Sequence, residues 1–324
     1  MTRLLTQWLC IGLFAMAITA TAAAPPPPAY NEALELIHAF SGSGDELQKA
    51  RQIADGLMKS DPKSGYSQVL HAEALSTWRL DQKGQPADIR DQVLALADEA
   101  IKLNPNLAQA HVAKARALVR SSLHERANAS IDAALKLEPN LSGALFLRAQ
   151  IFRRTGAISE AETWHKKFID STPHAARKAN GYGWLGTMYE EAGAKDPAQR
   201  AAWTAKARTA YENEIRLAPD GAWRNLNFAV FLNDHAADFD AAERYAQKAL
   251  SMKEAPKARY HWAAAKYQKL GVDAAKLQGP KLVEAVDGIA KATRVPLAEA
   301  VKFEEFSGVV RGRLKELQGR LPRP

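Results

Sequence analysis

The chain has 324 residues, of which 47% are hydrophobic and 25% charged, and its formal net charge is +8. This length and composition allow a substantial buried core, which excludes a disordered chain and a small scaffold held by disulfides. Cys10 is the only cysteine, so no disulfide can form within the chain.

The N-terminus has the composition of a secretory signal peptide. Arg3 is followed by an apolar run from Trp8 to Ile18 and then by small residues. The run is shorter than the ~20 residues that span a bilayer. Cleavage fits after Ala22 or Ala24, and Pro25 favours Ala22. We therefore predict a signal peptide at 1–22 and a proline-rich spacer at 23–29. The mature protein is then expected to be periplasmic or secreted, and not an integral membrane protein.

Three prolines further along the chain recur at a fixed period. Pro105, Pro139 and Pro173 lie 34 residues apart, and each follows a similar short sequence segment. Such a period indicates a stacked repeat protein. Between the prolines, as in Leu145–Phe152, apolar residues recur at helical spacings of three and four. Each repeat is therefore predicted to be a pair of helices that a proline closes.

The residue types of these repeats resemble the tetratricopeptide repeat. In residues 142–175 the matching positions are Leu145, Ala149, Phe152, Gly156, Ala161 and Pro173. The next unit carries a close copy of the first-helix signature between Tyr182 and Tyr189. The repeats are predicted at about 30–62, 65–107, 108–141, 142–175, 176–221 and 222–256, with a partial one at 257–277. Insertions are predicted between the two helices of two units, around Asp81–Asp88 and Lys195–Thr204.

The resemblance implies an all-α, right-handed superhelical solenoid of antiparallel helix pairs. Beyond residue 277 the repeat register is lost, and residues 278–324 are predicted to form a helical cap and a basic tail. Helices are expected near Lys281–Thr293 and Leu297–Leu317. Residues 257–324 hold 14 Lys and Arg against 7 Asp and Glu. This excess indicates either attraction to an anionic surface or a solvated helical face with a frayed end.

Several patterns that look like chemical motifs are better explained by helix packing. Gly181, Gly183 and Gly186 spell a dinucleotide-binding fingerprint, but no strand is predicted before them. The histidines lack metal-ligand spacing. Asp234, Asp238 and Asp240 lack the remainder of a calcium loop and suit a helix cap. No nucleophile motif is present. We therefore predict no enzymatic activity, no catalytic residue, no cofactor and no metal.

The family resemblance also implies where binding occurs. In this family the first helix of each repeat lines a concave groove, and five of its positions face ligands. The corresponding residues are Val112, Arg116, Arg120, Phe146, Gln150, Arg153, Arg154, Thr187, Glu190, Glu191, Trp223 and Asn233. The early repeats contribute arginines and the middle repeats carboxylates. These positions are either a binding groove with a basic part or simply solvated positions on exposed helices.

These features predict a non-catalytic scaffold that binds a protein segment, in envelope assembly or secretion. Arg116, Arg153 and Arg154 would favour acidic groups, while Phe146 or Val112 would supply apolar contact. The alternative is an anionic polysaccharide held by the groove arginines and Trp223, since an exposed aromatic can stack on a sugar ring. Nucleic acid is not expected, because no recognition motif or interleaved aromatic pattern accompanies the basic residues.

Overall fold

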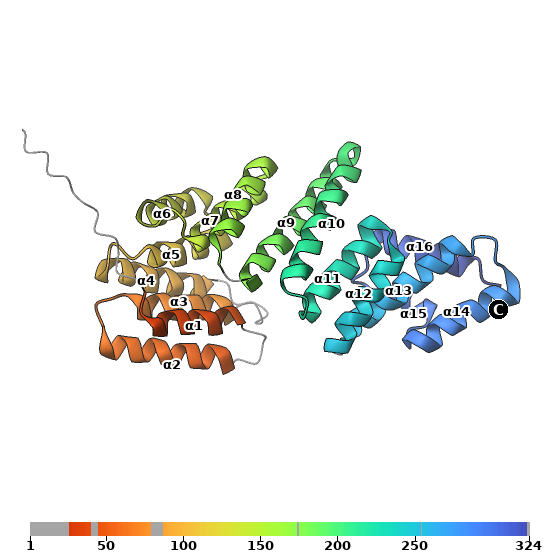
Figure 1. Cartoon of the computed structure of the whole chain (residues 1–324), viewed down its shortest axis with the longest axis horizontal. Coiled ribbons are helices and arrows are strands. Elements are labelled where there is room, and N and C mark those ends of the chain that lie inside the picture. Colours follow the sequence, from red (N-terminus) through yellow and green to blue (C-terminus); the bar gives the residue numbers. More distant parts are fainter. Residues whose placement is uncertain (1–25, 40–44, 79–86, 174, 254, 323–324) are drawn as a thin grey trace, which may run out of the picture. The chain divides into compact units, whose positions relative to one another are not determined.

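The computed structural model describes residues 26–39, 45–78, 87–173, 175–253 and 255–322, and within these ranges every regular element is a helix (Figure 1). The predicted signal peptide and most of the insertion predicted at Asp81–Asp88 lie outside the described residues. The chain divides into two compact units, residues 1–107 and 108–324. No helix in the described ranges is both long and apolar enough to cross a membrane.

The first unit contains two helix pairs. Their bounds are α1 Pro28–Ala39, α2 Asp45–Ser60, α3 Tyr66–Trp78 and α4 Ala87–Leu103. Alanines and aliphatic residues fill the interior, and the rings of Tyr30 and Tyr66 meet at 4.7 Å between centroids. Gly65 precedes α3 with a φ of +78°, and a Cβ on it would meet the Ala100 carbonyl oxygen at 3.0 Å. Glycine is therefore required at this junction.

The second unit continues the same pairing and then adds shorter helices at its C-terminal end. Its elements are α5 Ala108–Arg120, α6 His124–Leu137, α7 Ser142–Thr155, α8 Ile158–Ser171, α9 Ala175–Lys195, η2 Pro197–Gln199, α10 Arg200–Leu217, α11 Ala222–Phe231, the π-helical turn η3 Leu232–Ala236, α12 Phe239–Met252, α13 Pro256–Asp273, α14 Gly279–Thr293, α15 Leu297–Lys302 and α16 Gly308–Gly319. Each pair packs on the next, so the unit is an all-α solenoid of the predicted kind.

The prolines mark the ends of the second helices, as the period predicted. α6 ends two residues before Pro139, and α8 ends two residues before Pro173. Proline cannot donate the backbone hydrogen bond that would extend the helix, and the residue before it is turned away from helical angles. α5 and α7 accordingly begin 34 residues apart, at Ala108 and Ser142.

The insertion predicted around Lys195–Thr204 lengthens both helices of its pair. α9 has 21 residues and α10 has 18, against 13 and 14 in the pair α5–α6, and only the turn η2 separates them. α9 and α10 run side by side over this length (Figure 1). The insertion therefore extends the paired helices rather than forming a separate loop.

The glycines of the apparent nucleotide fingerprint lie inside α9, where they allow close packing. A Cβ on Gly186 would lie 2.7 to 2.8 Å from carbons of the Tyr211 ring, and one on Gly181 would meet Phe168 and Ile169 at similar distances. The prediction that Gly186 is a close-packing position is therefore confirmed.

The C-terminal segment departs from the predicted helix pattern. The helix expected over Leu297–Leu317 is two helices, α15 and α16, because the chain leaves helical geometry at Phe303. Phe303 stacks on Tyr260 of α13 at 4.1 Å, and Phe306 packs edge-on against His261. Ser307 then caps α16 by accepting from the backbone N–H of Val310 at 3.2 Å. The break thus places two aromatic rings against α13.

Two basic residues of the C-terminal segment, Arg313 in α16 and Arg320 at its end, make structural contacts. Arg313 donates to the Gln268 side-chain oxygen at 2.9 Å and to the Asn233 carbonyl at 3.1 Å. Arg320 donates to the carbonyls of Gly271 and Leu277, at 3.1 and 3.0 Å, and also to that of Ala274. These carbonyls lie at and just beyond the end of α13, where backbone acceptors lack helical partners. The two arginines therefore join the C-terminal helices to the last repeat.

Candidate functional site

We use the name first-helix face for the surface formed by α5, α7, α9, α11 and α13, the first helix of each pair in the second unit. Contacts join neighbouring helices of this face, and one of them pairs two predicted groove residues, Arg153 and Glu191. Arg153 on α7 reaches Glu191 on α9, and Arg224 on α11 donates to the Asn180 side chain on α9 at 2.7 Å. The face is thus a continuous surface across three repeats.

Three of the predicted groove residues are buried and cannot contact a ligand as predicted. Val112 is 6% exposed, and its side chain packs so closely on Gly143 that a Cβ there would lie 2.9 Å from a Val112 methyl. Gln150 is also 6% exposed. Asn233 is wholly buried in the turn η3, where it donates to the His261 carbonyl at 3.0 Å and accepts from Gln268 at 3.2 Å. Its role in this structure is to fix η3 against α13.

An arginine of an early repeat meets a carboxylate of a middle repeat at the centre of the face. A guanidinium nitrogen of Arg153 lies 2.5 Å from a carboxylate oxygen of Glu191, so one charge of each sign is neutralised. The Arg153 Nε also donates to Gln150 at 3.2 Å. Arg153 is therefore a fixed polar group rather than a free attractor of anions. The attraction of Arg153 for acidic groups of a partner is therefore weaker than its sequence position indicated.

Trp184 is a surface residue of the face that sequence reasoning missed. Its side chain is 39% exposed, its ring lies 5.9 Å from that of Phe146, and the Arg153 guanidinium sits 5.5 Å above it. The sequence contained a signal for this residue. Trp184 follows Asn180 by one helical turn and precedes Glu191 by two, so the three residues share one face of the helix. Phe146, Trp184, Arg153 and Glu191 together form what we call the tryptophan patch.

The remaining predicted arginines are already engaged within the protein. Arg154 donates to the Val119 carbonyl at 3.4 Å, which ties α7 to α5. Arg116 and Arg120 are half-buried, and each has an interaction partner. These side chains consequently have less freedom to reach a ligand than their sequence positions indicated.

The carboxylates beside the tryptophan patch are only partly accessible to water. Burial, followed by repulsion from Asp234 and Glu191, raises the pKa of Glu190 to about 7, although a hydrogen bond from Tyr211 opposes this rise. Burial likewise raises the pKa of Asp234 to about 6, although a hydrogen bond from Ser307 and the positive charge of Arg313 oppose this rise. The Tyr211 hydroxyl lies 3.3 Å from that of Thr187. Thr187 and Glu190 are therefore joined to the core through one tyrosine.

The raised pKa of Glu190 predicts a pH dependence of stability. Its ordinary value is 4.5, so the folded state holds the proton more tightly than the unfolded chain does, and stability falls as pH rises from about 4.5 to about 7. We expect the melting temperature of the wild type to fall more steeply across this window than that of Glu190→Gln. The difference between the two curves isolates Glu190 from other titrating groups. Parallel curves would contradict the assignment.

Trp223 lies at the start of α11 with 65% of its surface accessible. Its neighbour Arg224 joins Asn180 and lies 3.5 Å from Glu214 of α10. Burial raises the pKa of Glu214 to about 7, although Arg224 opposes the rise. Trp223 thus projects from a segment that is held by polar contacts.

His165 and His261, two histidines of the repeat helices, are packing residues, in agreement with the sequence analysis. His165 is wholly buried and touches Phe146 edge-on, and burial, then Arg153, lower its pKa to about 4. Burial, then Lys257, lower the pKa of His261 to about 3. In the ranges that the structure describes, no group of three or more His, Cys, Asp or Glu side chains is placed to hold a metal ion. The Asp238 carboxylate caps α12, accepting from Ala241 at 3.1 Å.

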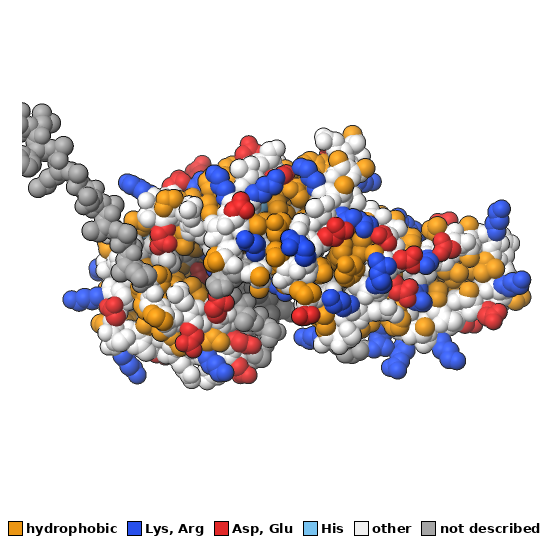
Figure 2. Space-filling model, viewed as in Figure 1, with side chains coloured by type: hydrophobic (Ala, Val, Ile, Leu, Met, Phe, Trp, Pro, Cys, Tyr) orange, Lys and Arg blue, Asp and Glu red, His pale blue; other side chains and the backbone are white. Residues whose placement is uncertain are grey.

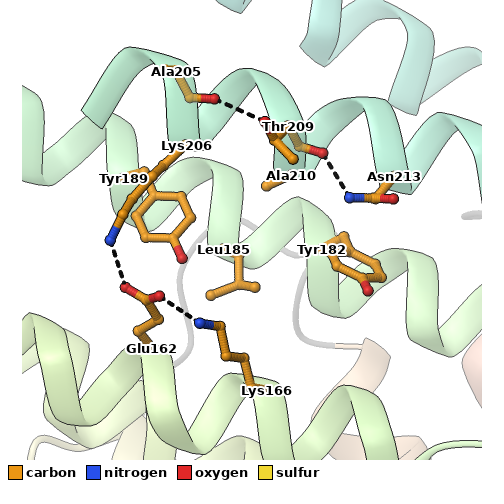
Figure 3. Close-up of a pocket in the computed structure, with 10 residues that line it drawn as sticks. All are labelled: Glu162, Lys166, Tyr182, Leu185, Tyr189, Ala205, Lys206, Thr209, Ala210 and Asn213. Atoms are coloured by element: carbon orange, nitrogen blue, oxygen red, sulfur yellow. Dashed lines mark hydrogen bonds and ion pairs between the residues drawn. The ribbon is translucent and has the colours of Figure 1, made fainter. Parts of the chain in front are cut away.

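A separate pocket lies among α8, α9 and α10, with a volume of about 440 Å³ (Figure 3). None of the predicted groove residues lines it. Tyr182, Leu185 and Tyr189 come from α9, and Glu162 and Lys166 come from α8. Figure 2 shows hydrophobic side chains at the surface between α8 and α10, with lysine and arginine side chains around them.

Comparison with known proteins defines the fold and no more. No family model and no curated protein matches the chain. Among solved structures, the human IFIT1 dimer with PPP-AAAA has a TM-score of 0.55 and 18% identity, over 91% of this chain and 70% of that one. The human IFIT1 dimer with m7Gppp-AAAA has a TM-score of 0.57 and 19% identity, and the match covers 90% of this chain and 62% of that one. The APC/C hetero-tetramer Cut9–Hcn1 has a TM-score of 0.55 and 13% identity, and the match covers 88% of this chain and 48% of that one.

The chain thus spans about half to two thirds of the length of these matched proteins. They are tetratricopeptide-repeat proteins, and the likeness shows that the present chain has the tetratricopeptide-repeat fold.

Proposed function

We propose that the chain is a non-catalytic scaffold, exported to the bacterial periplasm, that holds a segment of a partner protein against its first-helix face. The fold supports the binding role, since stacked helical repeats present extended surfaces rather than enclosed pockets. The N-terminal sequence supports export. Envelope assembly or secretion is the setting that these two features suit.

The observation that carries the proposal is the tryptophan patch. A half-exposed Trp184 stands against Phe146 and beneath a guanidinium that is itself fixed by Glu191. Tryptophan and arginine are the residue types that most often dominate binding energy at protein interfaces. Because the patch is held by contacts across two helices, little side-chain freedom is lost when a partner binds. A partner residue with an apolar body and a polar end suits this surface.

The patch is tested by removing its ring. Trp184→Ala is expected to weaken association with the partner by about 30-fold, the loss of about 2 kcal/mol typical of a central aromatic residue. The measurement is recovery of the protein crosslinked to the chain in cells of the source organism. Trp164→Ala is the matched control, because Trp164 lies on α8 outside the first-helix face, where Lys167 sits 4.3 Å above its ring.

Equal recovery of the crosslinked protein with both variants would refute the first-helix face as the binding surface. Thermal unfolding of each variant separates lost binding from lost structure.

One observation favours a second candidate function, the binding of an anionic polysaccharide. Trp223 is exposed enough to stack on a sugar ring. In gels containing an acidic polysaccharide, retardation of the wild type that is lost on Trp223→Ala would support this function in place of the first. A matched gel containing RNA tests the prediction that nucleic acid is not a partner.

Export predicts a defined mature N-terminus. Expression with the native leader in a bacterial host is expected to give a periplasmic protein that begins at Ala23, which intact-protein mass spectrometry measures. Recovery of the uncleaved chain from the cytoplasm would refute the proposed location.

A further inference from the structure

The pocket among α8, α9 and α10 belongs to a different surface from the tryptophan patch. α9 forms its floor, while α8 and α10 form its walls (Figure 3). Tyr182, Leu185 and Tyr189 are spaced by three and four residues, so they follow one stripe of α9 for about 10 Å. The volume of about 440 Å³ falls within the range of about 300 to 1,000 Å³ in which small-molecule sites lie.

The pocket exists because the wall from α10 is made largely of small residues. Ala205, Thr209 and Ala210 line it, and their side chains are too short to fill the space that faces α8. Thr209 turns its hydroxyl to the Ala205 carbonyl at 3.1 Å, so it presents its methyl group to the surroundings. The floor and this wall are therefore chiefly apolar.

The rim of the pocket carries an excess of positive charge. The Glu162 carboxylate accepts from Lys166 at 2.7 Å and from Lys206 at 3.1 Å, which links the two walls (Figure 3). Burial opposes ionisation of Glu162, but the two lysines prevail and hold its pKa below the usual value. Two ammonium groups thus share one carboxylate. A second carboxylate could be accepted here without removing the first.

The two lysines differ in how freely they can turn toward a ligand. The Lys206 ammonium lies 5.3 Å from the Tyr189 ring centroid and 4.9 Å from that of Trp203, so it is held over two aromatic rings. The Lys166 side chain is 61% exposed and has Glu162 as its ion-pair partner. Lys166 is therefore the group that can turn to an incoming carboxylate at least cost.

We propose that this pocket binds a partner peptide through one leucine-sized side chain. That side chain packs against Leu185, Ala205 and Ala210, and an adjacent carboxylate of the peptide pairs with Lys166. The carboxylate comes either from the C-terminus of the partner or from an acidic residue beside the apolar one. The site does not depend on the first-helix face. Loss of binding at the tryptophan patch would therefore leave it intact.

The test uses three short probes and the full mature chain. They are N-acetyl-leucine, which carries a C-terminal carboxylate, N-acetyl-Asp-Leu-amide, which carries a side-chain carboxylate, and N-acetyl-Asn-Leu-amide, which carries none. Binding is followed through the methyl resonances of Leu185 in protein labelled at leucine methyl groups. We expect a saturable shift with at least one carboxylate probe, and weaker binding of the neutral probe by about threefold to fivefold, as a partly exposed ion pair gives.

Two pairs of variants make the result specific. Lys166→Gln is expected to remove the preference for a carboxylate, whereas Lys167→Gln, which alters the neighbouring lysine over the Trp164 ring, is expected to keep it. Ala205→Leu fills the pocket from its wall and is expected to abolish the Leu185 shift. Ala201→Leu is its control, because Ala201 is exposed on the same helix and does not line the pocket.

Which carboxylate probe binds more tightly identifies the source of the group. The proposal is overturned if no probe gives a saturable shift at Leu185, if the neutral probe binds as tightly as the others, or if Ala205→Leu binds like the wild type.

Discussion

Gly186→Ala is expected to destabilise the second unit by about 1 to 3 kcal/mol, the usual cost of one added carbon in a packed interior. The new Cβ would lie 2.7 to 2.8 Å from carbons of the Tyr211 ring. That ring cannot easily move, because it is buried against Phe228 and Phe231 and its hydroxyl meets Thr187. The free energy of unfolding in urea measures the effect.

Gly288→Ala is the matched control for this substitution. Gly288 also lies within a helix, α14, but a Cβ on it would have nothing within 4 Å. Alanine is favoured over glycine inside a helix by up to about 1 kcal/mol, so this variant is expected to be more stable than the wild type. Destabilisation of similar size in both variants would show that contact with Tyr211 does not decide the result.

Arg313→Met is expected to destabilise the C-terminal helices by about 1 to 3 kcal/mol, because buried acceptors would lose their donor. Arg313 supplies hydrogen bonds to Gln268 and to the backbone of Asn233, which in turn holds the His261 carbonyl. Methionine keeps most of the apolar part of the arginine side chain, so the lost stability measures the contribution of the guanidinium group. Urea unfolding again gives the free energy, and hydrogen exchange of α16 locates the change.

Arg311→Met separates this structural role from a general effect of charge. It removes the same charge from the same helix two residues away, and its expected effect is below about 0.5 kcal/mol. If Arg311→Met and Arg313→Met were equally destabilised, the hydrogen-bond account would be wrong. If neither were destabilised, the C-terminal arginines would be available for an external anion after all.

The repeat fold could be predicted because its rules are local. A proline after each second helix ends that helix wherever it occurs, and Pro139 and Pro173 do so here. The same holds for Gly186, since a glycine at a fixed place in a helical repeat indicates close packing. Positions separated by one repeat occupy equivalent places, so one recognised unit predicts the next.

The binding face could be predicted only in part, because its chemistry depends on contacts between repeats. Arg153 and Glu191 are 38 residues apart, and only the packing of α7 on α9 brings their charges together. Asn233 occupies a predicted groove position, but the π-helical turn η3 buries its side chain. A π-helical turn adds a residue to the helical register and so shifts the face that later residues occupy.

The pocket and the C-terminal arrangement carried no sequence signal. Small residues such as Ala205 and Ala210 are ordinary in a helical repeat, and the space they leave becomes apparent only when α8 is in place. The break at Phe303 has neither glycine nor proline beside it. It follows from tertiary packing, because Phe303 and Phe306 gain contacts with Tyr260 and His261 that a continuous helix would not allow.

The central proposal, that the first-helix face holds a partner segment, is tested most directly by site-specific photocrosslinking. The photoreactive residue p-benzoylphenylalanine replaces Trp184 on α9 in one protein and Trp164 on α8 in another, so that one aromatic residue is exchanged for another in both. We predict a single major crosslinked product from position 184, lost when Arg153→Glu is added, and none from position 164. The same product from both positions, or its survival with Arg153→Glu, would contradict the proposal.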